Sequence, residues 1–245
     1  MSVSFGSARL LRYVIASAAK FSESAVVNVS KDEFVLKAID PSTVALLVLR
    51  VPKEYALAYK VTSNEQLVVN LKELGRVIRS AERDDMVTLE WTQSSLVISF
   101  ERRGFKRVFT LPLASSTSEV FDIELEYPNT YVISPTHFYE ALESLEGVGD
   151  VLRVEGFEEG VRLKAESELG EAEVVLSKER GEVEDLEVKA PEFSVSYTMR
   201  FITYFKPIVR VSEKLVIKVG SGLPLYLESQ SQGVRIEYYV APRAD

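Results

Sequence analysis

Apolar residues recur at helical spacing in two stretches of the first half of the chain. Residues three and four apart share one face of a helix, so this pattern predicts amphipathic helices packed against a core. We expect helices at Ser7–Lys20 and Leu71–Ala81. Their apolar stripes are Leu10, Leu11, Val14, Ile15 and Ala18 in the first helix, and Leu71, Leu74, Val77, Ile78 and Ala81 in the second.

Most other apolar residues fall in short β-rich runs bounded by turn residues, a pattern that predicts strands. The strands expected in the first half are Ala25–Val29, Glu33–Ala38, Val44–Val51, Gln66–Asn70, Val87–Trp91, Ser95–Phe100 and Lys106–Leu113. Those expected in the second half are Thr130–Ile133, Val151–Glu155, Val161–Ala165, Glu171–Ser177, Phe193–Tyr197, Leu215–Val219, Leu225–Ser229 and Gly233–Val240. We also expect helices at Pro135–Glu146 and Met199–Phe205, the latter ended by Pro207.

The order of these elements repeats at a nearly constant offset. Val35–Ala38, Val68–Leu71 and Met86–Trp91 correspond to Arg162–Ala165, Ser194–Tyr197 and Leu215–Gly220, at offsets of 127, 126 and 129 residues. A solenoid repeat would be only about 20–50 residues long. We therefore expect an α+β chain of two tandem similar domains, 1–113 and 129–245, each with two helices. Residues 114–128 are the expected linker, polar at first and apolar enough near residue 128 to pack down.

Composition excludes several kinds of chemistry. The chain has 245 residues, 46% of them apolar, with no Cys and a single His, His137. Disulfides and thiolate metal sites are therefore excluded, and a His-based triad has almost no material. There is no Gly-rich phosphate loop, and we expect Asp84 and Asp85 to face solvent in a turn. We predict no catalytic residue, no metal and no cofactor. Without a secretion signal or a long apolar run, we expect no membrane partner and a cytoplasmic, nucleoid-associated protein, or a nuclear one if eukaryotic.

Cations gather on the polar faces of the helices although the net charge is −8. Such segregation favours contact with a nucleic-acid backbone without sequence readout, whereas an ordinary solvated helix face is the alternative. The candidates are Arg9, Arg12 and Lys20 on the first helix, Lys72, Arg76, Arg79 and Arg83 on the second, and Arg200, Lys206 and Arg210 in the second half. The helix at Pro135–Glu146 is instead acidic, with Glu140, Glu143 and Glu146 outward.

Two strands carry opposite charge at their ends. Arg102, Arg103, Lys106 and Arg107 lead into one strand, and Glu166, Glu168, Glu171 and Glu173 surround the other. This suits head-to-tail pairing of Phe105–Leu113 with Glu171–Ser177 of a neighbouring subunit, and ordinary edge protection is the alternative. The expected contacts are Lys106, Arg107, Val108, Phe109 and Leu111 on one side, and Glu171, Glu173, Val174 and Leu176 on the other.

Three segments carry a resemblance to a known family: Leu36–Val44, Asp84–Leu89 and Tyr239–Arg243. With the order of elements and the place of the linker, the whole chain resembles the PCNA sliding clamps of archaea and eukaryotes, and its ending is most like archaeal members. The resemblance implies a ring of three subunits that encircles duplex DNA, with helices lining the hole and β-sheets outside. It implies no catalysis. The ring would act as a processivity factor and tether the polymerase, flap nuclease, ligase and clamp loader.

The resemblance also implies a pocket near the linker for short partner peptides with a glutamine, an aliphatic residue and paired aromatics. Carried over by position, its residues are Ile39, Thr43, Val44, Leu46, Leu125, Tyr127, Pro128, Pro224, Tyr239, Ala241 and Pro242. The acidic third helix departs from the family's basic lining, which favours a heterotrimer with paralogous clamp subunits over a homotrimer. A checkpoint-type ring subunit and a monomeric nucleic-acid-binding protein are the alternatives.

Overall fold

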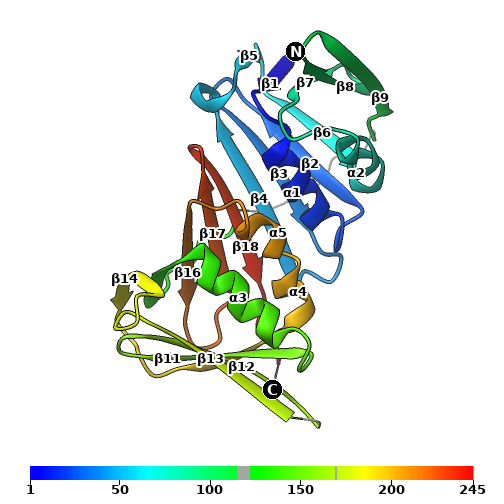
Figure 1. Cartoon of the computed structure of the whole chain (residues 1–245). Helices are drawn as coiled ribbons and strands as arrows, with labels where there is room; N and C mark the ends of the chain where they lie inside the picture. The colour runs from blue at the N-terminus through cyan, green and yellow to red at the C-terminus, as the bar shows by residue number, and fades with distance from the viewer. Residues whose placement is uncertain (115–121, 169, 245) are drawn as a thin grey trace. The chain divides into compact units, whose positions relative to one another are not determined.

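The computed structural model describes residues 1–114, 122–168 and 170–244, which divide into two compact units (Figure 1). The first unit comprises Met1–Pro41, Leu47–Phe121 and Gln232–Ile236. The second comprises Ser42–Leu46, Asp122–Ser231 and Glu237–Asp245. Each unit thus takes a short segment from the other half of the chain.

The first unit holds two antiparallel sheets and two helices. One sheet has the order β5-β1-β7-β8-β9, and the other strands follow the order β4-β3-β2-β6. The strands are β1 (Ser2–Phe5), β2 (Ser24–Val29), β3 (Glu33–Ile39), β4 (Ala45–Pro52), β5 (Ala58–Lys60), β6 (Glu65–Asn70), β7 (Met86–Trp91), β8 (Ser95–Arg102) and β9 (Phe105–Pro112). The helices are α1 (Arg9–Ala18) and α2 (Leu71–Arg79), and a 3-10 turn, η1, covers Lys53–Tyr55.

The second unit repeats this plan. Its strands are ordered β14-β10-β16-β17 and β13-β12-β11-β15. They are β10 (Asn129–Ile133), β11 (Val151–Phe157), β12 (Gly160–Ser167), β13 (Gly170–Ser177), β14 (Val183–Val188), β15 (Ser194–Thr198), β16 (Lys214–Val219) and β17 (Leu225–Ser231), followed by β18 (Val234–Val240), whose residues divide between the units. The helices are α3 (Pro135–Leu145), α4 (Met199–Thr203) and α5 (Lys206–Val209).

Local sequence explains where the helices begin. Asn70 caps α2, because its side-chain oxygen accepts a hydrogen bond from the Glu73 N–H at 2.9 Å. Pro135 opens α3 in the first turn, where a missing N–H is tolerated. Pro207 was expected to end helical structure, but it lies in the first turn of α5. The sequence therefore gives two short helices, with Pro207 starting the second one.

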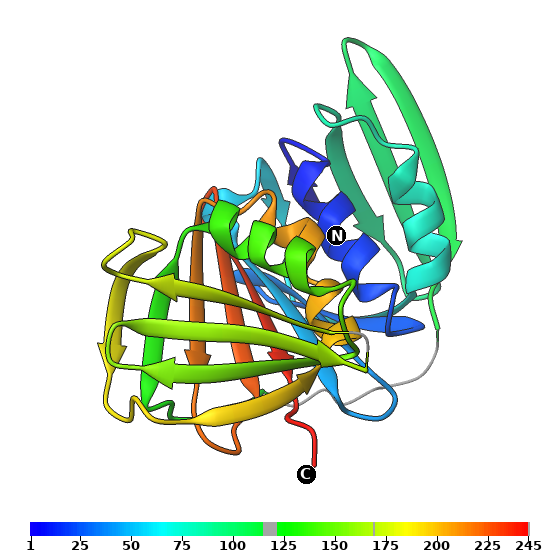
Figure 2. The ribbon, with the colours of Figure 1, turned by 60° about the horizontal axis from the view of Figure 1, so that its bottom comes forward.

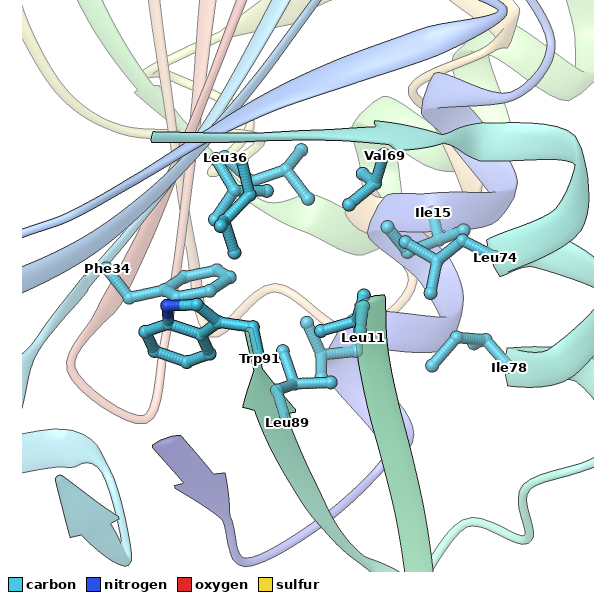
Figure 3. A pocket seen from close by; sticks show the side chains of 12 residues that line it. Leu11, Ile15, Phe34, Leu36, Val69, Leu74, Ile78, Leu89 and Trp91 are labelled. Atoms are coloured by element: carbon cyan, nitrogen blue, oxygen red, sulfur yellow. The ribbon is translucent and has the colours of Figure 1, made fainter. Parts of the chain in front are cut away.

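The core of the first unit lies under α1 and α2. Leu11 and Ile15 of α1, Leu74 and Ile78 of α2 and Trp91 of β7 line a small apolar cavity of about 20 Å³ (Figure 3). The predicted apolar stripes of both helices are thus confirmed as core-facing, except that Leu10 is only half-buried. No helix in the described ranges is long and apolar enough to cross a membrane.

The order of elements corrects one of the correspondences expected from the sequence. The starts of α2 at Leu71 and α4 at Met199 are 128 residues apart. The counterpart of Val68 is therefore Ser196, not Ser194 as expected from the sequence. The two positions share a contact: the Ala114 N–H donates to the Val68 carbonyl at 3.1 Å, and the Arg243 N–H donates to the Ser196 carbonyl at 2.8 Å. In both units, the chain after the last strand pairs with the strand that precedes the second helix.

Candidate functional site

A groove between α1 and α2 collects cations in the first unit. The two helices lie side by side (Figure 2), and the groove has a volume of about 500 Å³. Its cationic residues are Arg9, Arg12, Lys20, Arg79 and Arg83. The small residues Ala16, Ala19 and Gly75 also line it, which leaves room for a bulky anion, and among the described residues no Asp or Glu lines it.

The structure groups only part of the predicted basic face into this groove. Lys72 and Arg76 are exposed on α2 but are not among the lining residues. Arg76 donates to Glu73 Oε2 at 2.8 Å, an exposed pair one turn apart. Arg79 and Arg83 therefore combine with the α1 cations, whereas Lys72 and Arg76 form a flank.

Lys206 in the second unit does not lie on an open basic face, contrary to expectation. It is only 8% exposed, and its Nζ donates to Glu143 Oε1 at 2.9 Å and to Glu146 Oε1 at 2.7 Å. The physical reason is the packing of α3 against α5, which brings residues 60 or more positions apart into contact. Arg210 is exposed, and its guanidinium lies 5.2 Å from the Tyr139 ring centroid. The Arg200 guanidinium lies 5.2 Å from the Phe201 ring centroid.

The two strands predicted to pair between subunits, β9 and β13, are edge strands of their sheets. Phe105 and Val108 of β9 are 68% and 56% exposed, so two large apolar side chains of this edge strand face solvent. Phe109 and Leu111 are half-buried, and the Phe109 ring packs 5.7 Å from that of Phe100. On β13, Val174 is half-buried. Leu176 is buried at 2% exposure, so its assignment as a contact for a neighbour is wrong.

Ion pairs inside each unit occupy two of the predicted interface charges. Arg107 pairs with Asp85 and donates to the Ser80 carbonyl at 2.5 Å. Asp85 is 1% exposed, not solvent-facing as expected. Glu173 pairs with Arg162 at 2.9 Å and with Lys164 at 3.4 Å across the sheet. The two pairs of Glu173 form because the register of β12 against β13 places the three side chains on the same face of the sheet. Lys106 and Glu171 remain exposed on the two edge strands.

Several predicted pocket residues gather around an aromatic cluster in the second unit. The Val44 carbonyl accepts a hydrogen bond from the Ala241 N–H at 2.8 Å. The Tyr127 and Tyr239 rings lie 6.0 Å and 5.0 Å from the ring of Tyr226. Burial raises the pKa of Tyr127 to about 12, so its phenol stays neutral. These contacts bring the start of β4, the end of the linker and the chain end together.

Other pocket positions differ in exposure. Thr43 is exposed and has a φ of 58°, an uncommon value for a β-branched residue. Leu125 is 43% exposed. Pro128 packs so closely on Gly220 that an added Cβ there would lie 2.7 Å from the proline ring. Pro224, Ala241 and Pro242 are half-buried, and Ile39 is half-buried in the first unit.

Leu46 and Tyr239 are mostly core residues, at 4% and 9% exposure. Sequence reasoning missed Tyr226, which joins the tyrosines and donates to Glu228 Oε2 at 2.5 Å. The available signal was the alternation of Tyr226, Glu228 and Gln230 along β17, which puts all three on one face. The linker residues Val120 and Phe121 lie outside the described residues.

Comparison with known proteins identifies the family. Residues 1–121 match the model of the N-terminal domain of proliferating cell nuclear antigen (PCNA). The chain is 26% identical to DNA polymerase sliding clamp 2 of Saccharolobus solfataricus over 236 residues, covering 95% of each protein. It is also 26% identical to DNA polymerase sliding clamp 1 of Thermococcus kodakarensis, covering 99% of this chain and 98% of the relative.

Solved structures agree on the fold. A PCNA from Thermococcus kodakaraensis matches with a TM-score of 0.88 at 27% identity, covering 99% of each chain. The PCNA2–PCNA3 complex from Sulfolobus tokodaii matches with a TM-score of 0.90 over the full length of both chains, and at 23% identity it shows the fold alone. The expected fold class, an α+β chain with the two tandem domains of a sliding clamp, is thus confirmed. The chain belongs to the PCNA family of DNA sliding clamps and is of the archaeal type.

Proposed function

We propose that this chain is one subunit of a three-membered ring that encircles duplex DNA and tethers replication and repair enzymes to it. The observation that carries the proposal is the groove between α1 and α2. Its described lining brings five cations together without an acid, in a chain whose net charge is −8. Such segregation suits a phosphate backbone, which carries dense negative charge whatever the base sequence.

Removing groove cations should weaken DNA retention without sequence dependence. We expect Arg79→Ala with Arg83→Ala to lower affinity for duplex DNA, and to reduce the slope of log affinity against log salt by roughly 0.9 for each lost phosphate contact. Both side chains are exposed, so the fold should survive. The measurement is fluorescence anisotropy of labelled duplexes of different sequence over a range of salt.

A control with the same charge change is Arg180→Ala with Lys214→Ala, because both residues are exposed and neither lines the groove. The groove assignment fails if both double variants bind DNA as the original chain does, or if both lose the same affinity.

Assembly by strand pairing is supported by a contact inside the second unit. There β18, the counterpart of β9, ends beside Ser42–Leu46, the segment leading into β4, and β4 is the counterpart of β13. The Ala241 N–H donates to the Val44 carbonyl in this contact. Strands β9 and β13 are therefore the counterparts of two segments that lie beside each other in the second unit. In the described structure, the outer edges of β9 and β13 themselves have no such neighbouring strand. Pairing β9 of one subunit with β13 of the next gives a heterologous contact, which closes a ring when the rotation between subunits allows.

We also propose that the neighbours are paralogous clamps. The names of relatives in Saccharolobus solfataricus and Aeropyrum pernix number them as clamps 2 and 3, and the Sulfolobus tokodaii neighbour is a complex of two different clamp chains. The acidic row on α3 supports the same choice, because a homotrimer would repeat it three times.

The proposed partners are the replicative polymerase, flap nuclease, ligase and clamp loader, each bound through a short peptide at Val44, Tyr127 and Ala241. The subunit would carry no catalytic activity of its own. Domain boundaries at 1–113 and 129–245, with 114–128 as the connection, remain part of the proposal. Every relative named above is a DNA polymerase sliding clamp, so a checkpoint-type ring gains no support.

A further inference from the structure

Five side chains form one charged cluster where α3 packs against α5: Tyr139, Glu143, Glu146, Lys206 and Arg210. Lys206 is its centre, with its Nζ bonded to both carboxylates and 5.1 Å from the Tyr139 ring centroid. The Tyr139 hydroxyl donates to the same Glu143 oxygen at 2.9 Å. Two charge-assisted hydrogen bonds and an aromatic face thus hold one ammonium group.

The cluster presents its acids to solvent and keeps its lysine inside. The Lys206 side chain is 11% exposed, whereas those of Glu143 and Glu146 are 53% and 39% exposed. The hydrogen bond from Lys206, and then that from Tyr139, hold the pKa of Glu143 below its usual value. Burial lowers the pKa of Lys206, but its bonds to Glu143 and Glu146 outweigh this and leave the pKa raised. Glu143 and Lys206 are therefore both charged near neutral pH.

The same helix offers nothing to offset the exposed acids. All eleven residues of α3 are described, and none is Lys or Arg. Glu140 adds a further exposed carboxylate one turn before Glu143. An approaching polyanion would meet these carboxylates before the ammonium group, in contrast to the groove of the first unit, whose lining lacks acids.

We propose that Glu143 and Glu146 withhold Lys206 from DNA, so that this lysine of the second unit does not contact the phosphate backbone. The inference rests on the proposed DNA contact and specifies one cation of the second unit that does not take part in it. To bind Lys206, a phosphate would have to displace two carboxylates. Each of them already accepts a hydrogen bond from Lys206 Nζ at 2.9 Å or less. The two glutamates therefore act as positioning residues that keep Lys206 from contributing to the subunit's hold on DNA.

The test releases Lys206 by removing the two competing charges. Glu143→Gln with Glu146→Gln keeps acceptor oxygens for the fold, and Glu143→Gln alone is a milder variant that leaves Glu146 in place. Affinity for a duplex and its salt dependence are measured by anisotropy. We expect the double variant to bind DNA more tightly, with a salt slope steeper by roughly 0.9, equivalent to one more phosphate contact. Adding Lys206→Ala should abolish that gain.

Glu140→Gln is the matched control, because it removes one exposed carboxylate from the same helix without touching Lys206. The proposal is overturned if Glu140→Gln and Glu143→Gln raise affinity equally, if the gain survives Lys206→Ala, or if no gain occurs in a variant whose thermal unfolding is unchanged. The groove variant Arg79→Ala with Arg83→Ala distinguishes a failure of the Lys206 proposal from a failure of the proposed DNA contact. If it leaves DNA binding intact, the DNA contact itself is misassigned, whatever Lys206 does.

Discussion

At the scale of single residues, Asp85 shows how burial fixes the role of its partners. It is 1% exposed, accepts the Glu82 N–H at 2.7 Å and pairs with Arg107, while Arg102 lies 3.5 Å away. A buried carboxylate persists only with such partners. Arg107 also bonds the Ser80 carbonyl, so it fastens β9 to the turn after α2. Its role is to hold the edge strand in place within its own unit.

Replacing Arg107 should therefore destabilise the isolated subunit. We expect Arg107→Met to lower the free energy of unfolding by up to roughly 3 kcal/mol, because the buried Asp85 then keeps only Arg102, 3.5 Å away, as a charge partner. Lys106→Met, at the exposed neighbouring position, should change it by less than about 0.5 kcal/mol. Asp85→Asn in the Arg107→Met background should restore part of the loss. Chemical denaturation gives these values, and equal stability of the two methionine variants would contradict the assignment.

At the scale of elements, the end of the chain joins two segments of the second unit through main-chain hydrogen bonds. Its backbone bonds Val44 through Ala241, and Ser196 on β15 through Arg243. The second bond covers one edge of the sheet β13-β12-β11-β15 and leaves β13 as the open edge. The first bond fixes the half-buried Val44 beside the tyrosine cluster. The proposed peptide pocket is thus shaped by main-chain contacts as well as by apolar side chains.

A bulky charge at Val44 should block that pocket. We expect Val44→Arg to weaken binding of a synthetic peptide with a glutamine, an aliphatic residue and paired aromatics by about tenfold or more, on the order of 1.4 kcal/mol. Gln93→Arg adds the same charge at an exposed bend of the first unit and serves as the control. Tyr239→Ala is a poorer probe, because Tyr239 packs on Tyr226 in the core. Calorimetry showing equal affinity for both arginine variants would refute the pocket.

Sequence patterns predicted elements well where periodicity was strong, and failed where contacts were long-range. The apolar stripes read from the sequence coincide with the buried faces of α1 and α2, apart from the half-buried Leu10. Strand β1 was missed because four residues give too short an alternation, and β14 because acidic residues dominate it. The partners of Lys206 and Arg107 lie 63 and 22 residues away, so no local pattern shows that these cations are occupied.

At the scale of the whole molecule, the duplication leaves two complementary edges. Strand β9 carries exposed Phe105 and Val108 beside exposed Lys106, whereas β13 carries exposed Glu171. Because Arg107 and Glu173 are paired within their own units, Lys106 and Glu171 would carry the charge complementarity toward a neighbour in the proposed assembly. Backbone pairing and apolar contact would supply most of the affinity, while these charges orient the edges.

Charge reversal on one edge should weaken assembly while leaving the subunit folded. We expect Lys106→Glu to shift the ring formed with paralogous clamps toward smaller species, and Lys60→Glu to leave it unchanged, because Lys60 is exposed on β5 at the opposite edge of the same sheet. Light scattering of this chain alone and mixed with paralogues measures the masses. Assembly undiminished by Lys106→Glu would exclude this edge. A closed trimer of this chain alone at low micromolar concentration would overturn the preference for paralogues. Head-to-tail pairing would then still predict a rescue: Glu171→Lys in one copy should partly restore its binding to a copy that carries Lys106→Glu.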